Sequence, residues 1–161
     1  RALQGCRGRS TNNIVEITND VMLGTGQPMH ACGLAKVRNG HIVVRRANEG
    51  ETIVTLDGKE RALSMERLVI ADQEHATGIA GVMGGEESEI TDGTQTVMFE
   101  SAAFDHANIR VTSRTLGLRT ESSGRFEKGV CAATAREAID RACQLVEMLP
   151  AGDGIGAVVA V

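Results

Sequence analysis

Apolar residues recur along this chain at two different spacings, and each spacing predicts a different kind of element. A spacing of three to four residues, typical of a helix with one buried face, predicts helices over about 10–23, 105–116 and 133–149. Short apolar runs predict strands over 42–46, 52–56, 68–71, 77–82 and 96–100. The order of one helix, several strands and then two helices favours an α+β fold over regular βαβ alternation.

Some element boundaries carry local signals of their own. Asp105 is placed to cap the second predicted helix, and Gly117 is placed to end it. The pair Asp57-Gly58 lies between apolar runs, which is a strong signal for a β-hairpin. The tail over 150–161 could add an edge strand or connect to another segment.

The composition is that of an ordinary globular chain. The 161 residues are 42% hydrophobic and 24% charged, which suits a single domain over 1–161. No apolar run approaches the roughly 20 residues that span a bilayer. The first residues lack a signal-peptide pattern, so we expect a cytoplasmic protein without a membrane partner.

Charge and aromatic content restrict the possible partners. The formal net charge of −4 disfavours a module that binds nucleic acid tightly on its own, so another module would have to hold any RNA partner. The three phenylalanines are the only aromatic residues, which disfavours recognition by base stacking. The four cysteines lack C-x-x-C spacing, and we interpret them as free thiols with no metal or cofactor.

Three segments could carry chemistry: 18–19 followed by 26–30, then 80–86, and 99–102 together with 118–127. His30 follows the Gly-Pro end of the first helix, so we place it in a loop, where a histidine is more often a surface residue than a catalyst. Glu100 ends a predicted strand and, alone, is most simply a solvated strand end. The glycines of 81–85 lack phosphate-loop spacing but could form a tight turn that a ligand approaches closely. Ser122 lacks the G-x-S-x-G context of a serine nucleophile.

Two charged runs have simpler explanations. The acidic run over 86–92 lacks the spacing of a calcium loop, so solvation explains it better than metal binding. Arg110, Arg114 and Arg119 could contact phosphates, although arginines near a helix are usually only solvated.

Seven ordered motifs together resemble one known family. They are NNIVEITN at 12–19, GQPMHA at 26–31, LDG at 56–58, VIAD at 69–72, GVMGG at 81–85, ESA at 100–102 and RFEKG at 125–129. In this order they are similar to the editing domain of the bacterial-type phenylalanyl-tRNA synthetase beta subunit. The resemblance covers about residues 3–149.

The resemblance implies a three-layer α+β domain that contains a β-sandwich of unusual topology, with flanking helices. It also implies hydrolysis of the ester that joins tyrosine to tRNA(Phe), because a synthetic pocket for phenylalanine cannot strongly exclude a ligand with one added hydroxyl. The implied partners are the 3′ end of tRNA(Phe) carrying tyrosine, the remainder of the beta subunit, and the alpha subunit. Amino-acid activation is not implied for this chain, since the family places it on the alpha subunit.

The resemblance also assigns roles to individual residues. Glu100 resembles the acidic residue that binds the tyrosine hydroxyl, and His30 and Asn19 resemble polar residues near the aminoacyl ester and the terminal adenosine. The residues implied to bind substrate are Pro28, Gly81, Glu100, Thr120 and Ser122. No activated nucleophile is evident, so we favour attack by a positioned water, with His30 acting as a base or only orienting that water.

Several positions depart from the family pattern and keep other functions open. The family commonly has Phe-Asp at Cys32-Gly33, Ala at Ser122, and an aromatic residue or His at Gly124. We expect the positions that lose bulk to face the rest of the subunit, whereas the Ser122 hydroxyl could narrow or repolarise the pocket. A catalytically silent scaffold or tRNA-docking domain is therefore the alternative, and an unrelated small-molecule binder is a third hypothesis.

Overall fold

The structure is a computed structural model that describes residues 10–148. Its helices are α1 (Ser10–Thr25), α2 (His106–Leu116), α3 (Glu121–Phe126) and α4 (Ala132–Met148). Its strands are β1 (Met29–Gly33), β2 (Val43–Arg46), β3 (Thr52–Val54), β4 (Glu60–Ala62), β5 (Leu68–Ala71), β6 (Ala76–Ile79), β7 (Met83–Gly84) and β8 (Val97–Ser101). Short 3-10 turns are η1 (Leu34–Lys36), η2 (Arg38–Gly40) and η3 (Glu86–Ser88). None of these helices is long and apolar enough to cross a membrane.

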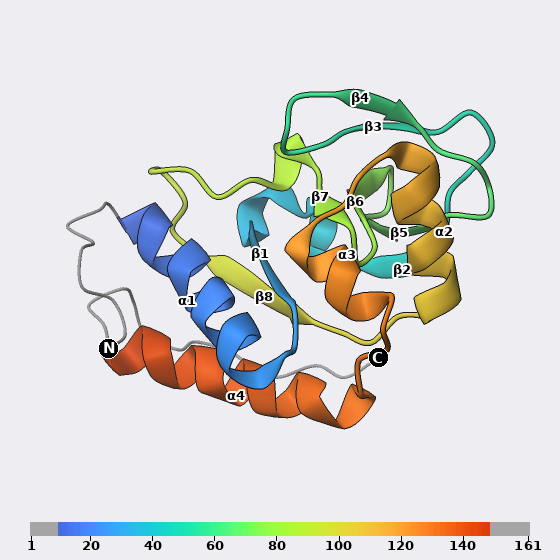
Figure 1. The fold of residues 1–161 in the computed structure, drawn as a ribbon. Coiled ribbons are helices and arrows are strands. Elements are labelled where there is room, and N and C mark those ends of the chain that lie inside the picture. Colours follow the sequence, from blue (N-terminus) through green and yellow to red (C-terminus); the bar gives the residue numbers. More distant parts are fainter. Residues whose placement is uncertain (1–9, 149–161) are drawn as a thin grey trace.

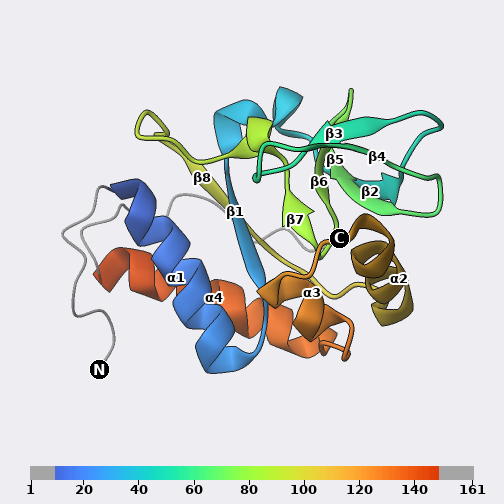
Figure 2. The same ribbon diagram turned by 45° about the horizontal axis from the view of Figure 1, so that its top comes forward.

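The strands form three antiparallel sheets, and the predicted α+β class is confirmed. β1 pairs with β8, β3 pairs with β4, and a four-stranded sheet has the order β2-β5-β6-β7. Figure 1 shows the helices α1 and α4 at one end of the molecule and the four-stranded sheet with α2 and α3 at the other. The β1–β8 ribbon lies between these two parts, as the rotated view in Figure 2 makes clear.

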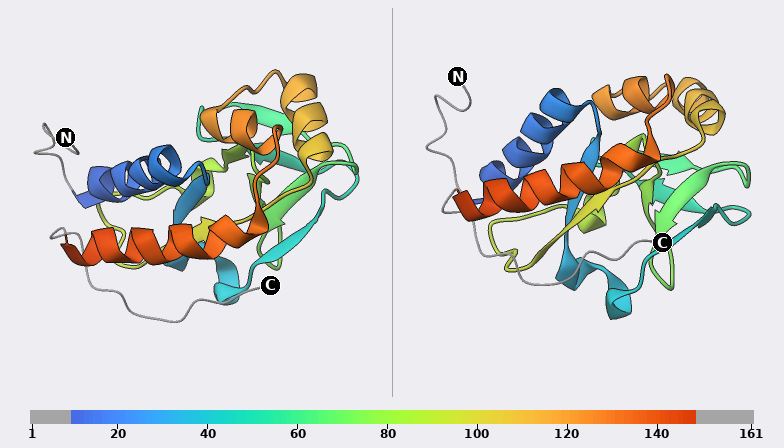
Figure 3. Two further views of the ribbon diagram at one scale, coloured as in Figure 1. Left: turned by 60° about the horizontal axis from the view of Figure 1, so that its bottom comes forward. Right: turned by 90° about the horizontal axis from the view of Figure 1, so that it is seen from below.

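The β1–β8 ribbon separates a helical core from the interior of the domain. Alternate side chains of a strand point to opposite faces. Met29, Ala31 and Phe99 pack against a core formed by α1 and α4, in which Ile17 and Ala138 are fully buried. Both views of Figure 3 show α4 running alongside this ribbon. The opposite face of the ribbon is therefore free to line a cavity.

A second core lies on the other side of the four-stranded sheet. It joins Ile53 of β3, Val69 of β5 and Ile79 of β6 to Ile109 of α2 and Phe126 of α3. Because Val69 and Ile70 are adjacent and both buried, β5 is covered on both faces, as its continuous apolar run predicts. The sheet is thus held by packing on one face and borders the interior on the other.

The predicted helices and most predicted strands are confirmed. Asp105 caps α2 by accepting a hydrogen bond from the Asn108 amide at 2.7 Å, and Gly117 ends the helix in the left-handed region with φ 63°. The Asp57-Gly58 hairpin is confirmed by the β3–β4 pair, with Gly58 at φ 73°. The predicted strand or connection over 150–161 lies outside the described residues.

The sequence did not predict β1, β7 or α3, and the loop assigned to His30 is wrong. His30 is the second residue of β1, which pairs with β8 along its whole length. The entry to β1 is fixed by Gln27, whose side chain is fully buried. Its amide donates to the carbonyls of Pro28 and Ala102, and its side-chain oxygen accepts from the Thr134 hydroxyl at 2.8 Å. This buried amide therefore connects the entry to β1 with the end of β8 and with α4.

Candidate active site

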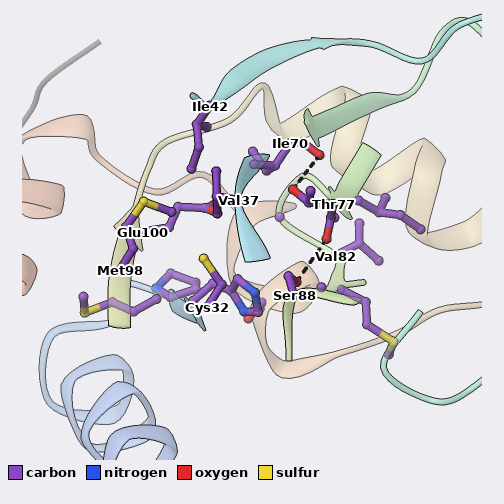
Figure 4. A pocket seen from close by; sticks show the side chains of 18 of the residues that line it. Cys32, Val37, Ile42, Ile70, Thr77, Val82, Ser88, Met98 and Glu100 are labelled. Atoms are coloured by element: carbon purple, nitrogen blue, oxygen red, sulfur yellow. Dashed lines mark hydrogen bonds between the residues drawn. The ribbon is translucent and has the colours of Figure 1, made fainter. Parts of the chain in front are cut away.

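A cavity that is open at its mouth lies between the β1–β8 ribbon and the four-stranded sheet. Figure 4 shows Cys32, Met98 and Glu100 near one another on one side and Ile70, Thr77 and Val82 on the other. Pro28, Gly81, Ser122 and Phe126 also line it. Apolar walls with a few converging polar groups are typical of a small-ligand site.

The ribbon brings His30 and Glu100 together from segments 70 residues apart in the sequence. Their Cα atoms are direct partners in the antiparallel β1–β8 pair, so both side chains lie on the same face with Cβ atoms roughly 5 Å apart. Both residues line the cavity and both are only half-buried. Within residues 10–148, neither side chain has a hydrogen-bond partner or an ion pair, so both have free polar atoms for a ligand or a water.

Burial shifts the proton affinities of this pair in opposite senses. Removal from solvent lowers the pKa of the His30 imidazole below 6.5, so the ring is neutral at neutral pH. The same cause raises the pKa of the Glu100 carboxyl to about 7. A neutral imidazole can accept a proton, and a carboxyl near its pKa can donate or accept a hydrogen bond.

Cys32 lies two residues after His30 in β1, so its side chain is on the same face of the ribbon as this pair. Its Cα partner is Met98, and its side chain is buried. Burial, and then the nearby charge of Glu100, raises the pKa of the Cys32 thiol to about 11. The thiol is therefore protonated at neutral pH and is a poor nucleophile.

Two glycines shape the cavity at close quarters. A Cβ at Gly84 would lie 2.6 Å from His30 Cε1 and 2.8 Å from Nε2, so the absence of a side chain makes room for the imidazole. Gly81 has φ 67° and would place a Cβ 3.0 Å from the rings of Phe104 and Phe126. Both the left-handed backbone and the crowding favour glycine at position 81.

Helix α3 supplies the remaining wall of the cavity, and Thr120 holds it in place. The Thr120 hydroxyl accepts from the Ser123 amide and donates to the Val82 carbonyl at 2.8 Å. The Ser123 hydroxyl in turn accepts from the Thr120 amide, which completes a reciprocal cap. These bonds join α3 to the 81–82 turn, so that Ser122 and Phe126 face the cavity.

The structure brings most, but not all, of the proposed site residues together. Lining the cavity are His30, Glu100, Pro28, Gly81 and Ser122. Thr120 does not line the cavity but caps α3, which forms part of the cavity wall. Asn19 is exposed on α1 and is not among the lining residues. Catalysis and substrate binding by these residues remain predictions.

Several lining residues were missed by sequence reasoning. Cys32, Ile70, Thr77 and Met98 all line the cavity. Period-two alternation from Glu100 along the predicted strand 96–100 would have found Met98. The same alternation from His30 would have found Cys32, had 29–33 been recognised as a strand. The expectation that the departing positions face outward is wrong for Cys32 and Gly33, because both are buried. Gly124 is half-buried, and a Cβ there would meet nothing within 4 Å.

Comparison with known proteins supports the same family as the motifs. A family model described as the B3/4 domain matches residues 1–151. The phenylalanine–tRNA ligase beta subunit of Clostridium acetobutylicum is 48% identical over 151 residues, which is 94% of this chain and 19% of that protein. The corresponding subunit of Moorella thermoacetica is 51% identical over 144 residues, 89% of this chain and 18% of that protein.

A third relative agrees with these two. The phenylalanine–tRNA ligase beta subunit of Bacillus subtilis is 48% identical over 145 residues, 90% of this chain and 18% of that protein. The chain thus spans about a fifth of the length of the curated relatives that it matches. With a family model matching nearly its whole length and relatives at this identity, the chain belongs to the B3/4 domain family and corresponds to one segment of the bacterial-type phenylalanine–tRNA ligase beta subunit.

Proposed function

We propose that this domain hydrolyses the ester of tyrosyl-tRNA(Phe) by means of a positioned water. The observation that carries the proposal is the His30–Glu100 pair on one wall of an apolar cavity. Buried polar groups in proteins normally have partners, and groups that keep free polar atoms in a cavity mark places where a ligand completes the bonding. The relatives are named as subunits of a ligase for phenylalanine. Tyrosine differs from phenylalanine by one added hydroxyl, which an apolar pocket cannot strongly exclude.

Glu100 supplies selectivity in this proposal. A phenol that enters between apolar residues such as Ile70 and Phe126 donates its hydrogen bond to the Glu100 carboxylate. Phenylalanine has no such donor and leaves the carboxylate without a partner in a cavity that removes it from water. That loss costs several kcal/mol in principle and protects correctly charged tRNA(Phe).

His30 handles the water in this proposal. Because burial lowers its pKa, the neutral ring can accept a proton from a water or hold that water by a hydrogen bond. The water oxygen bonds to the carbonyl carbon of the ester, and the bond from that carbon to the ribose oxygen breaks. The products are free tyrosine and tRNA(Phe) with its terminal hydroxyl restored, the proton of the water having moved to that hydroxyl.

This function implies a setting and a set of partners for the domain. The 3′ end of tRNA(Phe) enters the cavity, while the remainder of the beta subunit and the alpha subunit hold the rest of the tRNA. The domain works in the cytoplasm, where aminoacyl-tRNA is made and used. No metal or cofactor takes part, since the two side chains and a water suffice for ester hydrolysis.

Deacylation of tyrosyl-tRNA(Phe) by the 161-residue chain tests the proposal. We expect turnover that falls at least 100-fold in Glu100→Ala and in His30→Ala. We expect Glu60→Gln, which changes an exposed glutamate of β4, to leave it unchanged. Equal hydrolysis of phenylalanyl-tRNA(Phe) would contradict the selectivity assigned to Glu100. Turnover that survives both alanine variants would contradict the site.

A silent docking domain is the second candidate, and Ser122 is the observation that favours it. Ser122 lines the cavity, where a hydroxyl takes more room than the Ala that is common in the resembled family. If the chain binds tyrosyl-tRNA(Phe) without hydrolysing it at high protein concentration, and Ser122→Ala does not restore turnover, the docking function replaces the hydrolase.

A further inference from the structure

The charge of this acidic chain is distributed unevenly, and one segment is basic. Residues 106–128 carry five Lys or Arg against two Glu, whereas the rest of the chain carries twelve against nineteen. The basic segment comprises α2, α3 and the turn that joins them. An anionic polymer is therefore attracted more to this segment than to the rest of the chain taken together.

Two arginines of the segment are free to bind an anion. Arg119 and Arg125 are engaged by Glu127 and Glu121 respectively. Arg110 and Arg114 are exposed and lie one turn apart on α2, and neither forms an ion pair with any residue of 10–148. Each guanidinium group presents several donors in a planar fork, which can pair with a phosphate through two parallel hydrogen bonds.

The same helix is structurally joined to the cavity. Ile109, next to Arg110, is fully buried and packs in one core with Phe126, which lines the cavity. Figure 1 shows α2 and α3 side by side. The inner face of α2 thus supports the cavity wall while its outer face presents the two arginines.

The opposite charge borders the cavity elsewhere. Ser88 of η3 lines it, and the run around it contains the exposed acidic residues Glu86, Glu87, Glu89 and Asp92. A strand whose end enters the cavity is disfavoured along η3 and favoured along α2.

We infer that the outer face of α2, with Arg110 and Arg114, is the docking surface for phosphates of the tRNA acceptor strand whose 3′ end enters the cavity; this inference rests on the proposed function. The contribution is electrostatic and independent of sequence. Two phosphate contacts give weak affinity, which suits a domain whose substrate is held mainly by other parts of a larger enzyme.

The test compares two double variants of the 161-residue chain that lose the same charge. Arg110→Gln/Arg114→Gln changes the docking surface. Arg136→Gln/Arg141→Gln changes two exposed arginines of α4, which packs on the other face of the β1–β8 ribbon. Each is assayed for KM with tyrosyl-tRNA(Phe), for hydrolysis of 3′-tyrosyl adenosine, and for binding of uncharged tRNA(Phe) across a salt series.

We expect the α2 variant to raise KM for the tRNA ester fivefold to tenfold and to leave the adenosine ester unaffected. The slope of log affinity against log salt concentration should fall in magnitude by about 1.4 to 1.8 for two lost contacts. An equal effect of the α4 variant, or no change in tRNA binding by the α2 variant, overturns the docking surface. If the chain hydrolyses neither ester yet shows the expected salt dependence, the docking surface stands and the proposed hydrolase fails.

Discussion

Two half-buried glutamates, Glu51 and Glu100, differ in their hydrogen bonding and in the direction of their pKa shifts. The difference distinguishes a carboxylate that stabilises the fold from one that is available to a ligand. The Glu51 carboxylate accepts hydrogen bonds from both terminal nitrogens of Arg45 at 2.7 Å. It also accepts hydrogen bonds from the backbone amides of Asn48 at 2.7 Å and Ala76 at 3.0 Å. Glu100 has no hydrogen-bond partner among residues 10–148. The side-chain bond from Arg45 is the main reason that the pKa of Glu51 falls to about 2, whereas burial alone raises that of Glu100 to about 7.

The contrast shows that a carboxylate left without hydrogen bonds in a binding site lowers the stability of the free protein. At Glu51, four donors more than offset the desolvation of the charge, and the carboxylate ties the start of β3 to the end of β2 and the start of β6. At Glu100, no protein donor replaces the hydrogen bonds to water that the carboxylate loses on folding. A phenol that donates to Glu100 would therefore supply a hydrogen bond that the free protein lacks. The stability of the domain and the affinity of its cavity are therefore in opposition at this residue.

Removal of the charge at Glu51 should have the largest effect. Glu51→Gln places an amide NH2 against the donors of Arg45, and we expect the free energy of unfolding at pH 7 to fall by about 2–3 kcal/mol. The pKa of Glu51 is lowered from 4.5 to about 2, so its contribution is complete above pH 4.5 and is lost as pH falls through 2. Urea unfolding from pH 7 to pH 2 measures this, and parent and variant should converge at the acid end.

The control for this variant is Glu60→Gln on β4, which changes an exposed glutamate of the paired hairpin strand. It should alter the free energy of unfolding by less than about 0.5 kcal/mol at any pH. If both variants lose the same free energy of unfolding, the Arg45–Glu51 ion pair does not stabilise the fold more than an exposed glutamate does.

The same substitution at Glu100 should act in the opposite sense. The pKa of Glu100 is raised from 4.5 to about 7, so its contribution is complete below pH 4.5 and is lost as pH rises through 7. Above pH 7 the parent carries an unpartnered charge, and Glu100→Gln should be more stable by about 1–2 kcal/mol, a value reduced by the open cavity mouth. Urea unfolding at pH 5 and pH 8.5 tests this. A gain of equal size at both values would trace the effect to packing and not to charge.

The sequence predicted those parts of the fold that depend on neighbouring residues. α2 was predicted with both of its ends because Asp105 and Gly117 act within one turn of the helix. β1 was missed because its five residues follow a helix terminator and its two faces are buried against different partners. α3 was missed because Ser122, Ser123 and Gly124 are poor helix formers, and its stability comes from the reciprocal cap and from tertiary packing.

The candidate site was predictable only through resemblance. Local patterns favoured a surface role for His30 and a solvated role for Glu100. The β1–β8 register that makes them neighbours is set by a pairing across 70 residues, and a shift of one residue would turn one of them toward the helical core. Long-range register is not encoded in either segment alone, so the pair emerges only when the two strands are seen together.

The smallest expected effect tests the difference between the Glu51 carboxylate and the His30 imidazole in how their side chains are held. Glu51 is held by bonds, whereas His30 is held only by packing, and Gly84 provides the space for its ring. A Cβ at position 84 would lie 2.6 Å from His30 Cε1, the far end of a side chain that can rotate away. We therefore expect Gly84→Ala to lower kcat for tyrosyl-tRNA(Phe) about threefold to tenfold, with little change in the urea midpoint. In the comparison variant Gly85→Ala, the added Cβ would meet the Thr77 carbonyl oxygen at 2.6 Å. That contact is with backbone, so this variant should lower the urea midpoint instead; if Gly84→Ala behaves in the same way, the imidazole is as firmly held as the carboxylate of Glu51.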